Sequence, residues 1–157
     1  MSKAKLYLGR AGQMVVMSEF LDRGYNVAVP EVDAGDHIFV VKDDSGEFTR
    51  IQVKTSRSKT TNHGAITQYN VRLSQLKLPI VPEIWYIFVQ RVANKWCDYI
   101  IISREQLFEY YENEGIGSPS NGKLNLPIKH KDNQVICSGI NLTKHVNDWS
   151  KWPSLIL

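Results

Sequence analysis

The sequence has no long apolar run and few cysteines. No apolar stretch approaches the ~20 residues that a helix needs to span a bilayer, and the basic start is not followed by the apolar core of a signal peptide. The 2 cysteines, Cys97 and Cys137, lack CxxC spacing, which favours buried thiols over a disulfide framework or a zinc site. We therefore expect a cytoplasmic protein without membrane contact, in which the sequon at Asn141 is a chance match.

Acidic residues are missing from the middle of the chain. None occurs between Glu47 and Glu83, whereas the preceding residues 1–47 carry 8 acidic and 5 basic residues. The basic residues of this segment, with His63, are Arg50, Lys54, Arg57, Lys59, Arg72 and Lys77. A basic middle beside a carboxylate-bearing start is what a polyanion-binding surface requires. The alternative is an ordinary solvated face.

The 157 residues, 43% of them hydrophobic, fit a single domain over residues 1–157. Gln13, Val16, Met17 and Phe20 share one face of a helix predicted over residues 10–23 and ended by Gly24. Ser103 and Gln106 form a predicted capping box for a helix through Tyr111. Strands are expected over residues 25–29, 38–41, 48–54, 66–73, 84–90 and 96–102. Loops are expected over 55–64 and 113–133, and a short helix over 142–149, with Trp149 and Trp152 packing back on a sheet of mostly antiparallel strands.

Three polar residues are predicted to converge on the hairpin of residues 38–54. Asp36 precedes its first strand, and Gln52 and Lys54 lie on one face of the return strand, with Val53 turned into the core. A carboxylate, an amide oxygen and the carbonyl of Val53 are hard oxygen donors suited to Mg²⁺. An ammonium beside them can hold a phosphate or stabilise charge at phosphorus.

These residues resemble the PD-(D/E)XK nuclease superfamily. The likeness covers roughly residues 6–56 and consists of Gly9-x-x-Gly12 at the start of the first helix, Gly35-Asp36 before a strand, and Gln52-x-Lys54 in the next strand. It is greatest to small members: archaeal Holliday-junction resolvases, some restriction enzymes, and homing endonucleases that use Gln-x-Lys. The resemblance implies a restriction-endonuclease-like α/β fold, a mixed central β-sheet flanked by helices.

The resemblance also implies roles. Asp36 is the main ligand of Mg²⁺ or Mn²⁺, Gln52 and the Val53 carbonyl complete the protein's share of the shell, and Lys54 contacts the attacking water and the phosphate. The family usually adds a helical Glu where this chain has Gln13, which leaves Asp36 as the site's one carboxylate unless Glu31 or Asp33 joins it. Glu19, ~240° around the helix from Gln13, is expected on the solvated surface.

The resulting expectation is a metal-dependent DNA endonuclease that acts as a homodimer. Its predicted DNA contacts are Arg50, Arg57, Lys59 and Arg72. The glutamines at 13 and 52 keep a second reading open, a non-catalytic nucleic-acid-binding or interaction module on the same fold. A nucleotide or small-phosphate hydrolase ranks lower because no phosphate-cradling motif occurs. The four histidines, which lack metal-ligand spacing, are expected to be surface or structural.

Overall fold

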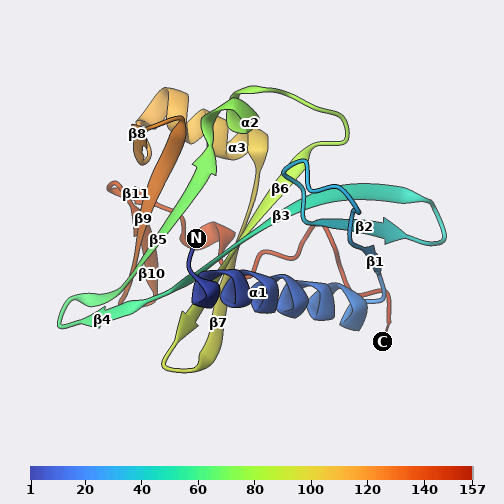
Figure 1. The fold of residues 1–157 in the computed structure, drawn as a ribbon, viewed down its shortest axis with the longest axis horizontal. Helices are drawn as coiled ribbons and strands as arrows, with labels where there is room; N and C mark the ends of the chain where they lie inside the picture. The colour runs from blue at the N-terminus through green and yellow to red at the C-terminus, as the bar shows by residue number, and fades with distance from the viewer. Residues whose placement is uncertain (157) are drawn as a thin grey trace.

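The computed structural model describes residues 1–156 and contains two β-sheets and one long helix (Figure 1). In chain order the main elements are α1 (Lys3–Asp22), β1 (Asn26–Ala28), β2 (Ile38–Lys42), β3 (Glu47–Arg57), β4 (Lys59–Thr61), β5 (Gly64–Arg72), α2 (Leu73–Lys77), β6 (Ile84–Val92), β7 (Lys95–Ser103), α3 (Arg104–Glu109), a π-helical turn (Tyr110–Glu114), β8 (Ser118–Ser120), β9 (Lys123–Lys131), β10 (Gln134–Cys137), β11 (Ile140–Asn141) and a 3₁₀ turn (Thr143–His145). No helix within these residues is long and apolar enough to cross a membrane.

The first sheet has the strand order β1-β2-β3-β6-β7 and is mixed. Its neighbours pair antiparallel except β3 and β6, which run parallel with Gln52 opposite Tyr86. A parallel pair needs a long crossover connection, and here β4, β5 and α2 supply it. The expected mixed central sheet flanked by helices is therefore present.

The second sheet has the order β11-β10-β9-β5-β4, with β8 added alongside β9. Its strands come from segments that the sequence analysis assigned mainly to loops. Residues 113–133 were expected to be a loop but contain β8 and β9, and the expected loop 55–64 contains the end of β3 and all of β4. Both of those expectations were wrong.

Two apolar cores lie on opposite faces of the first sheet. Along β6, Tyr86 and Phe88 belong to the core shared with the second sheet, whereas Ile87 and Val89 belong to the core under α1. This alternation is the two-residue period of a strand buried on both faces. The molecule therefore has three layers, α1, the first sheet and the second sheet.

The helix α1 begins at Lys3, earlier than the predicted residue 10, because Ser2 caps it by accepting a hydrogen bond from the Lys5 N–H. The Gly9-x-x-Gly12 motif therefore lies inside the helix and not at its start. Val16 and Phe20 are fully buried, as the apolar stripe predicted.

The chain end packs as expected but with less helix. Trp149 and Trp152 pack edge-on against Phe20, with ring centroids 5.5 and 5.1 Å away. The predicted helix over 142–149 is reduced to the 3₁₀ turn Thr143–His145. The capping box of Ser103 and Gln106 is present. Cys137 is a buried thiol, whereas Cys97 is only half-buried.

Candidate functional site

The hairpin places Asp36 beside the middle of β3. The N–H of the next residue, His37, donates to the Ile51 carbonyl at 2.8 Å, which extends the β2–β3 ladder by one step. Asp36 is buried, with a side-chain exposure of 9%, and its Oδ2 lies 3.8 Å from a guanidinium nitrogen of Arg50. Asp36 therefore faces the side of the sheet that carries the even-numbered residues of β3.

Gln52 and Lys54 lie on that same face, whereas Val53 belongs to the core under α1. Gln52 is only 3% exposed, and its side-chain Oε1 is buried without a hydrogen-bond partner. An unpaired buried carbonyl oxygen costs about 1–3 kcal/mol. Such an atom is satisfied by a ligand, an ion or a water, or is kept because function requires the strain.

The backbone groups of Val53 point toward the start of β2. In a strand, the N–H and C=O of one residue point to the same side. The Val53 N–H donates to His37 Nδ1 at 3.2 Å, and the Ile51 carbonyl accepts from His37 N–H. Odd-numbered residues of β3 thus direct their backbone groups toward the start of β2. Asp36, Gln52 and Val53 are therefore all carried by the β2–β3 hairpin and the loop before it.

Lys54 is half-buried at the next position on the same face. Burial lowers the pKa of its ammonium, and the positive charges of Arg72 and Lys123 lower that pKa further, while Asp33 opposes the shift. A cationic cluster of Lys54, Arg72 and Lys123 therefore adjoins the oxygen donors. An anion such as phosphate would relieve the mutual repulsion of these three groups.

His37 joins the loop before β2 to β3. Its Nδ1 accepts the Val53 N–H, and its Nε2 lies 3.9 Å from Asp33 Oδ2. Burial lowers the pKa of His37, with Lys54 acting in the same direction. The Asp33 carboxylate already has a hydrogen-bond partner within its own loop, because its Oδ1 accepts from the Gly35 N–H at 2.9 Å.

Gln13 reaches the same loop from α1. Its Nε2 donates to the His37 carbonyl at 2.7 Å, while its Oε1 accepts from Arg10 at 2.9 Å. Gln13, which takes the position predicted for a helical Glu, therefore contacts the residue that directly follows Asp36. Glu19 lies elsewhere on α1, 3.9 Å from Arg23, as expected of a residue outside the site.

Gln75 in α2 is a site residue that the sequence analysis missed. Its Nε2 donates to the Gly35 carbonyl at 3.0 Å, and its Oε1 accepts from the Tyr86 hydroxyl at 2.9 Å. Tyr86 is the register partner of Gln52 in the parallel pair. Gln75 thus links the residue before Asp36 to the strand beside Gln52, across 40 positions of sequence.

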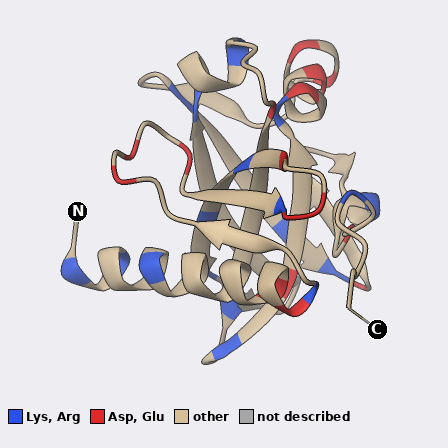
Figure 2. Ribbon diagram, turned by 90° about the vertical axis from the view of Figure 1, so that its right-hand side faces the viewer, with Lys and Arg blue, Asp and Glu red and all other residues tan. Residues whose placement is uncertain are grey.

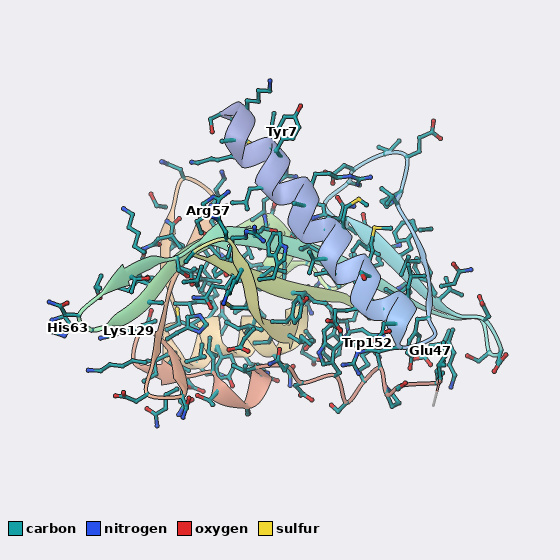
Figure 3. All side chains as sticks on the ribbon, turned by 90° about the horizontal axis from the view of Figure 1, so that it is seen from below. Tyr7, Glu47, Arg57, His63, Lys129 and Trp152 are labelled. Atoms are coloured by element: carbon teal, nitrogen blue, oxygen red, sulfur yellow. The ribbon has the colours of Figure 1, made fainter. Side chains whose placement is uncertain are left out.

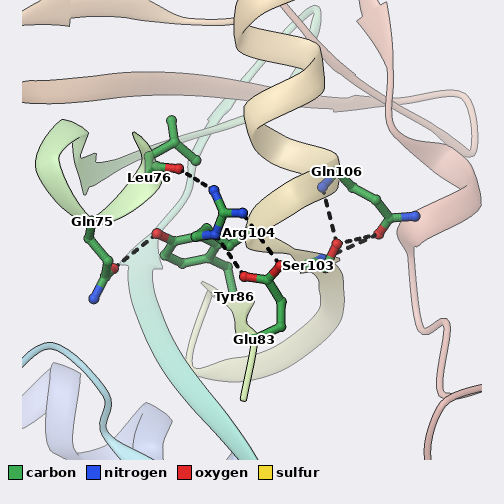
Figure 4. A network of polar contacts seen from close by, with 7 residues as sticks. All are labelled: Gln75, Leu76, Glu83, Tyr86, Ser103, Arg104 and Gln106. Carbon is green, nitrogen blue, oxygen red and sulfur yellow. Dashed lines mark hydrogen bonds and ion pairs between the residues drawn. The ribbon is translucent and has the colours of Figure 1, made fainter. Parts of the chain in front are cut away.

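A buried ion pair holds α2 in place (Figure 4). The Arg104 side chain, only 5% exposed, lies 2.7 Å from Glu83 and donates to the Leu76 carbonyl at 2.6 Å. Leu76 follows Gln75, so this network fixes the backbone that carries Gln75. Breaking it would release the loop that positions Asp36.

The predicted DNA-contact residues occupy two places. Arg50 lies against Asp36, whereas Arg57, Lys59 and Arg72 are exposed, with Arg72 close enough to Lys54 to lower its pKa. Figure 3 shows Arg57 below α1 and His63 and Lys129 at the outer end of the β4–β5 hairpin, away from Glu47 and Trp152. Figure 2 shows the acidic residues gathered in loops and helix ends.

The chemistry of the candidate donors is that of ligands for a hard divalent cation. Among residues 1–156, no group of three or more His, Cys, Asp or Glu is arranged to hold a metal. The donors at the site are Asp36, Gln52 Oε1 and the Val53 carbonyl. One charge and two neutral oxygens match Mg²⁺, which retains waters and shares phosphate oxygens with its substrate.

No family model matches this sequence, and no curated protein matches it. Among solved structures, the bacterial homing endonuclease I-Ssp6803I is similar to it. The match covers 96% of this chain and 91% of that chain, with a TM-score of 0.57 and 16% sequence identity. At that identity the likeness establishes the fold, a nuclease-like α/β fold, and the function has to be argued from the site.

Proposed function

We propose that this protein is a metal-dependent DNA endonuclease of the PD-(D/E)XK type that hydrolyses phosphodiester bonds. The observation that carries the proposal is the buried, unpartnered Oε1 of Gln52, which shares a strand face with Lys54 and with Arg50, the residue against Asp36. The nuclease-like fold supports it, since the solved structure that resembles this chain is a homing endonuclease.

Asp36, Gln52 Oε1 and the Val53 carbonyl would hold Mg²⁺ or Mn²⁺. The ion supplies positive charge where negative charge develops at phosphorus and lowers the pKa of a coordinated water. The protein supplies only one negatively charged ligand, the carboxylate of Asp36. We therefore expect the protein to bind the metal more tightly when DNA phosphate is present.

Lys54 would bind the scissile phosphate and orient the attacking water. Its lowered pKa means that it loses a proton more readily than an exposed lysine, so it can also exchange a proton with that water. Arg72 and Lys123 are placed to contact the neighbouring phosphates. Cleavage of both strands by one site per subunit favours a homodimer.

The test is cleavage of duplex and branched DNA with Mg²⁺ or Mn²⁺ by the wild type, Asp36→Asn and Lys54→Ala. Both variants should lose activity while their circular dichroism spectra and melting curves show a folded protein. Asp44→Asn and Lys42→Ala, in and beside the β2–β3 turn, are matched controls that should cleave normally. Normal cleavage by Asp36→Asn and Lys54→Ala would refute the assignment.

A second function, metal-independent nucleic-acid binding on a nuclease fold, is favoured by the glutamines at positions 13 and 52. Calorimetric titration with Mn²⁺, with and without DNA, separates the two. If the protein is a nuclease, it should bind the metal more tightly in the presence of DNA. Gln52→Glu should then tighten the binding of Mn²⁺ alone, because it adds a charged ligand. Salt-sensitive DNA binding without metal uptake would favour the binding module.

A further inference from the structure

The second sheet carries no acidic residue. Its strands β4, β5, β8, β9, β10 and β11 include the 5 cationic residues Lys59, Arg72, Lys123, Lys129 and Lys131, and neither Asp nor Glu. In an 18.0 kDa chain with 16 acidic residues, the exclusion of all of them from a sheet is a strong bias. A surface of one charge sign attracts a polyanion.

The two faces of this sheet differ sharply. Thr67, Tyr69 and Val71 of β5 are buried, opposite the buried Ile128, Leu126 and Leu124 of β9. The residues between them, Gln68, Asn70 and Arg72, are exposed. Since side chains on a strand alternate between faces, one face of the sheet forms the core and the other is open to solvent.

The pairing register gives the order of side chains on the open face. Arg72 lies opposite Lys123, Asn70 opposite Asn125, and Gln68 opposite Pro127. One step further, Ile66 lies between Lys59 and Lys129. Amide side chains therefore occupy the middle of a two-stranded ribbon, with cations at both ends. We call this surface, Lys59, Gln68, Asn70, Arg72, Lys123, Asn125 and Lys129, the outer ribbon.

We propose that the outer ribbon reads the sequence of double-stranded DNA in the major groove. Asn and Gln amides can donate to and accept from adenine N6 and N7 on the major-groove edge, and Lys and Arg at the ends can contact phosphates. The major groove, about 12 Å wide, admits a two-stranded ribbon, and the flanking strands β4, β8 and β10 pair with β5 and β9 only toward their ends. The six steps from Ile66 to Arg72 span about 20 Å at ~3.4 Å per residue, enough for each end to reach one backbone.

The outer ribbon leads into the candidate site. Arg72 and Lys123, the cations at one end of the ribbon, act on the charge of Lys54. The end of the ribbon that carries Arg72 and Lys123 therefore lies near Lys54, and a phosphate bound at that end would lie close to the candidate site. The biological role of this DNA binding rests on the proposed nuclease function. The binding itself does not require cleavage and can be tested without metal.

The experiment selects duplexes from a randomised pool with the wild type in EDTA, where no cleavage occurs. We expect an enriched motif that contains an A·T pair. Asn70→Ala and Asn125→Ala should reduce discrimination at defined motif positions by about 5- to 150-fold without changing the salt dependence. Lys129→Ala should weaken binding to every sequence and reduce the salt slope by about one.

The controls are Asn113→Ala, an exposed amide in the π-helical turn, and Lys95→Ala, an exposed cation at the start of β7. Neither should alter the motif or the slope. No enrichment by the wild type, an unchanged motif in both amide variants, or equal affinity for duplex RNA would overturn the inference. Selective binding without any metal-dependent cleavage would overturn the proposed nuclease function and leave the inference standing.

Discussion

Replacing Gln52 with methionine should make the metal-free protein more stable. Gln52 Oε1 is buried with no partner, which costs about 1–3 kcal/mol. Methionine keeps the length of the side chain and removes that atom. At the midpoint of about 2 kcal/mol, and at about 2–4 °C per kcal/mol for a domain of this size, the expected rise in Tm is about 4–8 °C.

The assay is thermal denaturation followed by circular dichroism, with and without Mn²⁺. At a metal concentration 100 times the dissociation constant, binding adds about 2.7 kcal/mol to the wild type. Gln52→Met should lose most of that gain. One substitution would then stabilise the free protein and abolish its stabilisation by metal.

Gln90 supplies a matched control. It is a buried glutamine in the neighbouring strand β6, but its amide nitrogen donates to the Ser58 hydroxyl. Gln90→Met should therefore lower Tm. If Gln52→Met lowers Tm by a similar amount, the Gln52 amide is a structural group, and its assignment as a metal ligand loses its basis.

Three further variants test the packing and electrostatics around the site. Gly12→Ala should lower the free energy of unfolding by about 1–3 kcal/mol in a denaturant titration, because the added Cβ would lie 1.9 Å from Thr55 Oγ1, whereas Gly9→Ala, with open space around it, should raise it by up to about 1 kcal/mol. Lys54→Met should raise Tm most at neutral pH, because burial lowers the folded pKa of Lys54 and the wild type bears the cost of a buried charge below that pKa. This cost disappears as the pH rises from the folded pKa toward the unfolded pKa. A difference in Tm between variant and wild type that does not shrink toward pH ~10 contradicts this reasoning. Glu83→Gln should lower the free energy of unfolding by about 3–5 kcal/mol in the same titration, because Arg104 stays buried without its counter-charge. The control is Glu47→Gln: the Glu47 side chain is 60% exposed and pairs only loosely with Lys151, so this change should have little effect.

The sequence predicted those parts of the structure that depend on neighbouring residues. The hairpin around Asp43–Gly46 and the capping box of Ser103 involve contacts over a few positions, and their residue types specify them. The shared face of Gln52 and Lys54 follows from strand alternation alone. Their convergence with Asp36 on one metal site stays a prediction.

The second sheet was missed although its signal was present. In β9 the buried Leu124, Leu126 and Ile128 alternate with polar residues, which is the pattern of a half-buried strand. Pro127 and the nearby glycines outweighed that alternation. Gln75 could not be predicted because its contacts with Gly35 and Tyr86 depend on how the crossover folds back over β3.

The site lies where β3 loses one of its two neighbours. The β2 ladder covers β3 from Glu47 to Ile51, with one further bond from His37, whereas the parallel ladder with β6 covers Arg50 to Arg57. Only over Arg50 and Ile51 is the strand paired regularly on both sides. At Val53 the N–H is taken by a side chain, and the carbonyl faces the loop that carries Asp36. A backbone oxygen is thus available next to a buried carboxylate, in a strand held rigidly from its other side. A position further back in β3 has its backbone bonded within the β2 ladder, so the unpaired edge of the strand begins at Gln52 and Val53, two of the three proposed metal ligands.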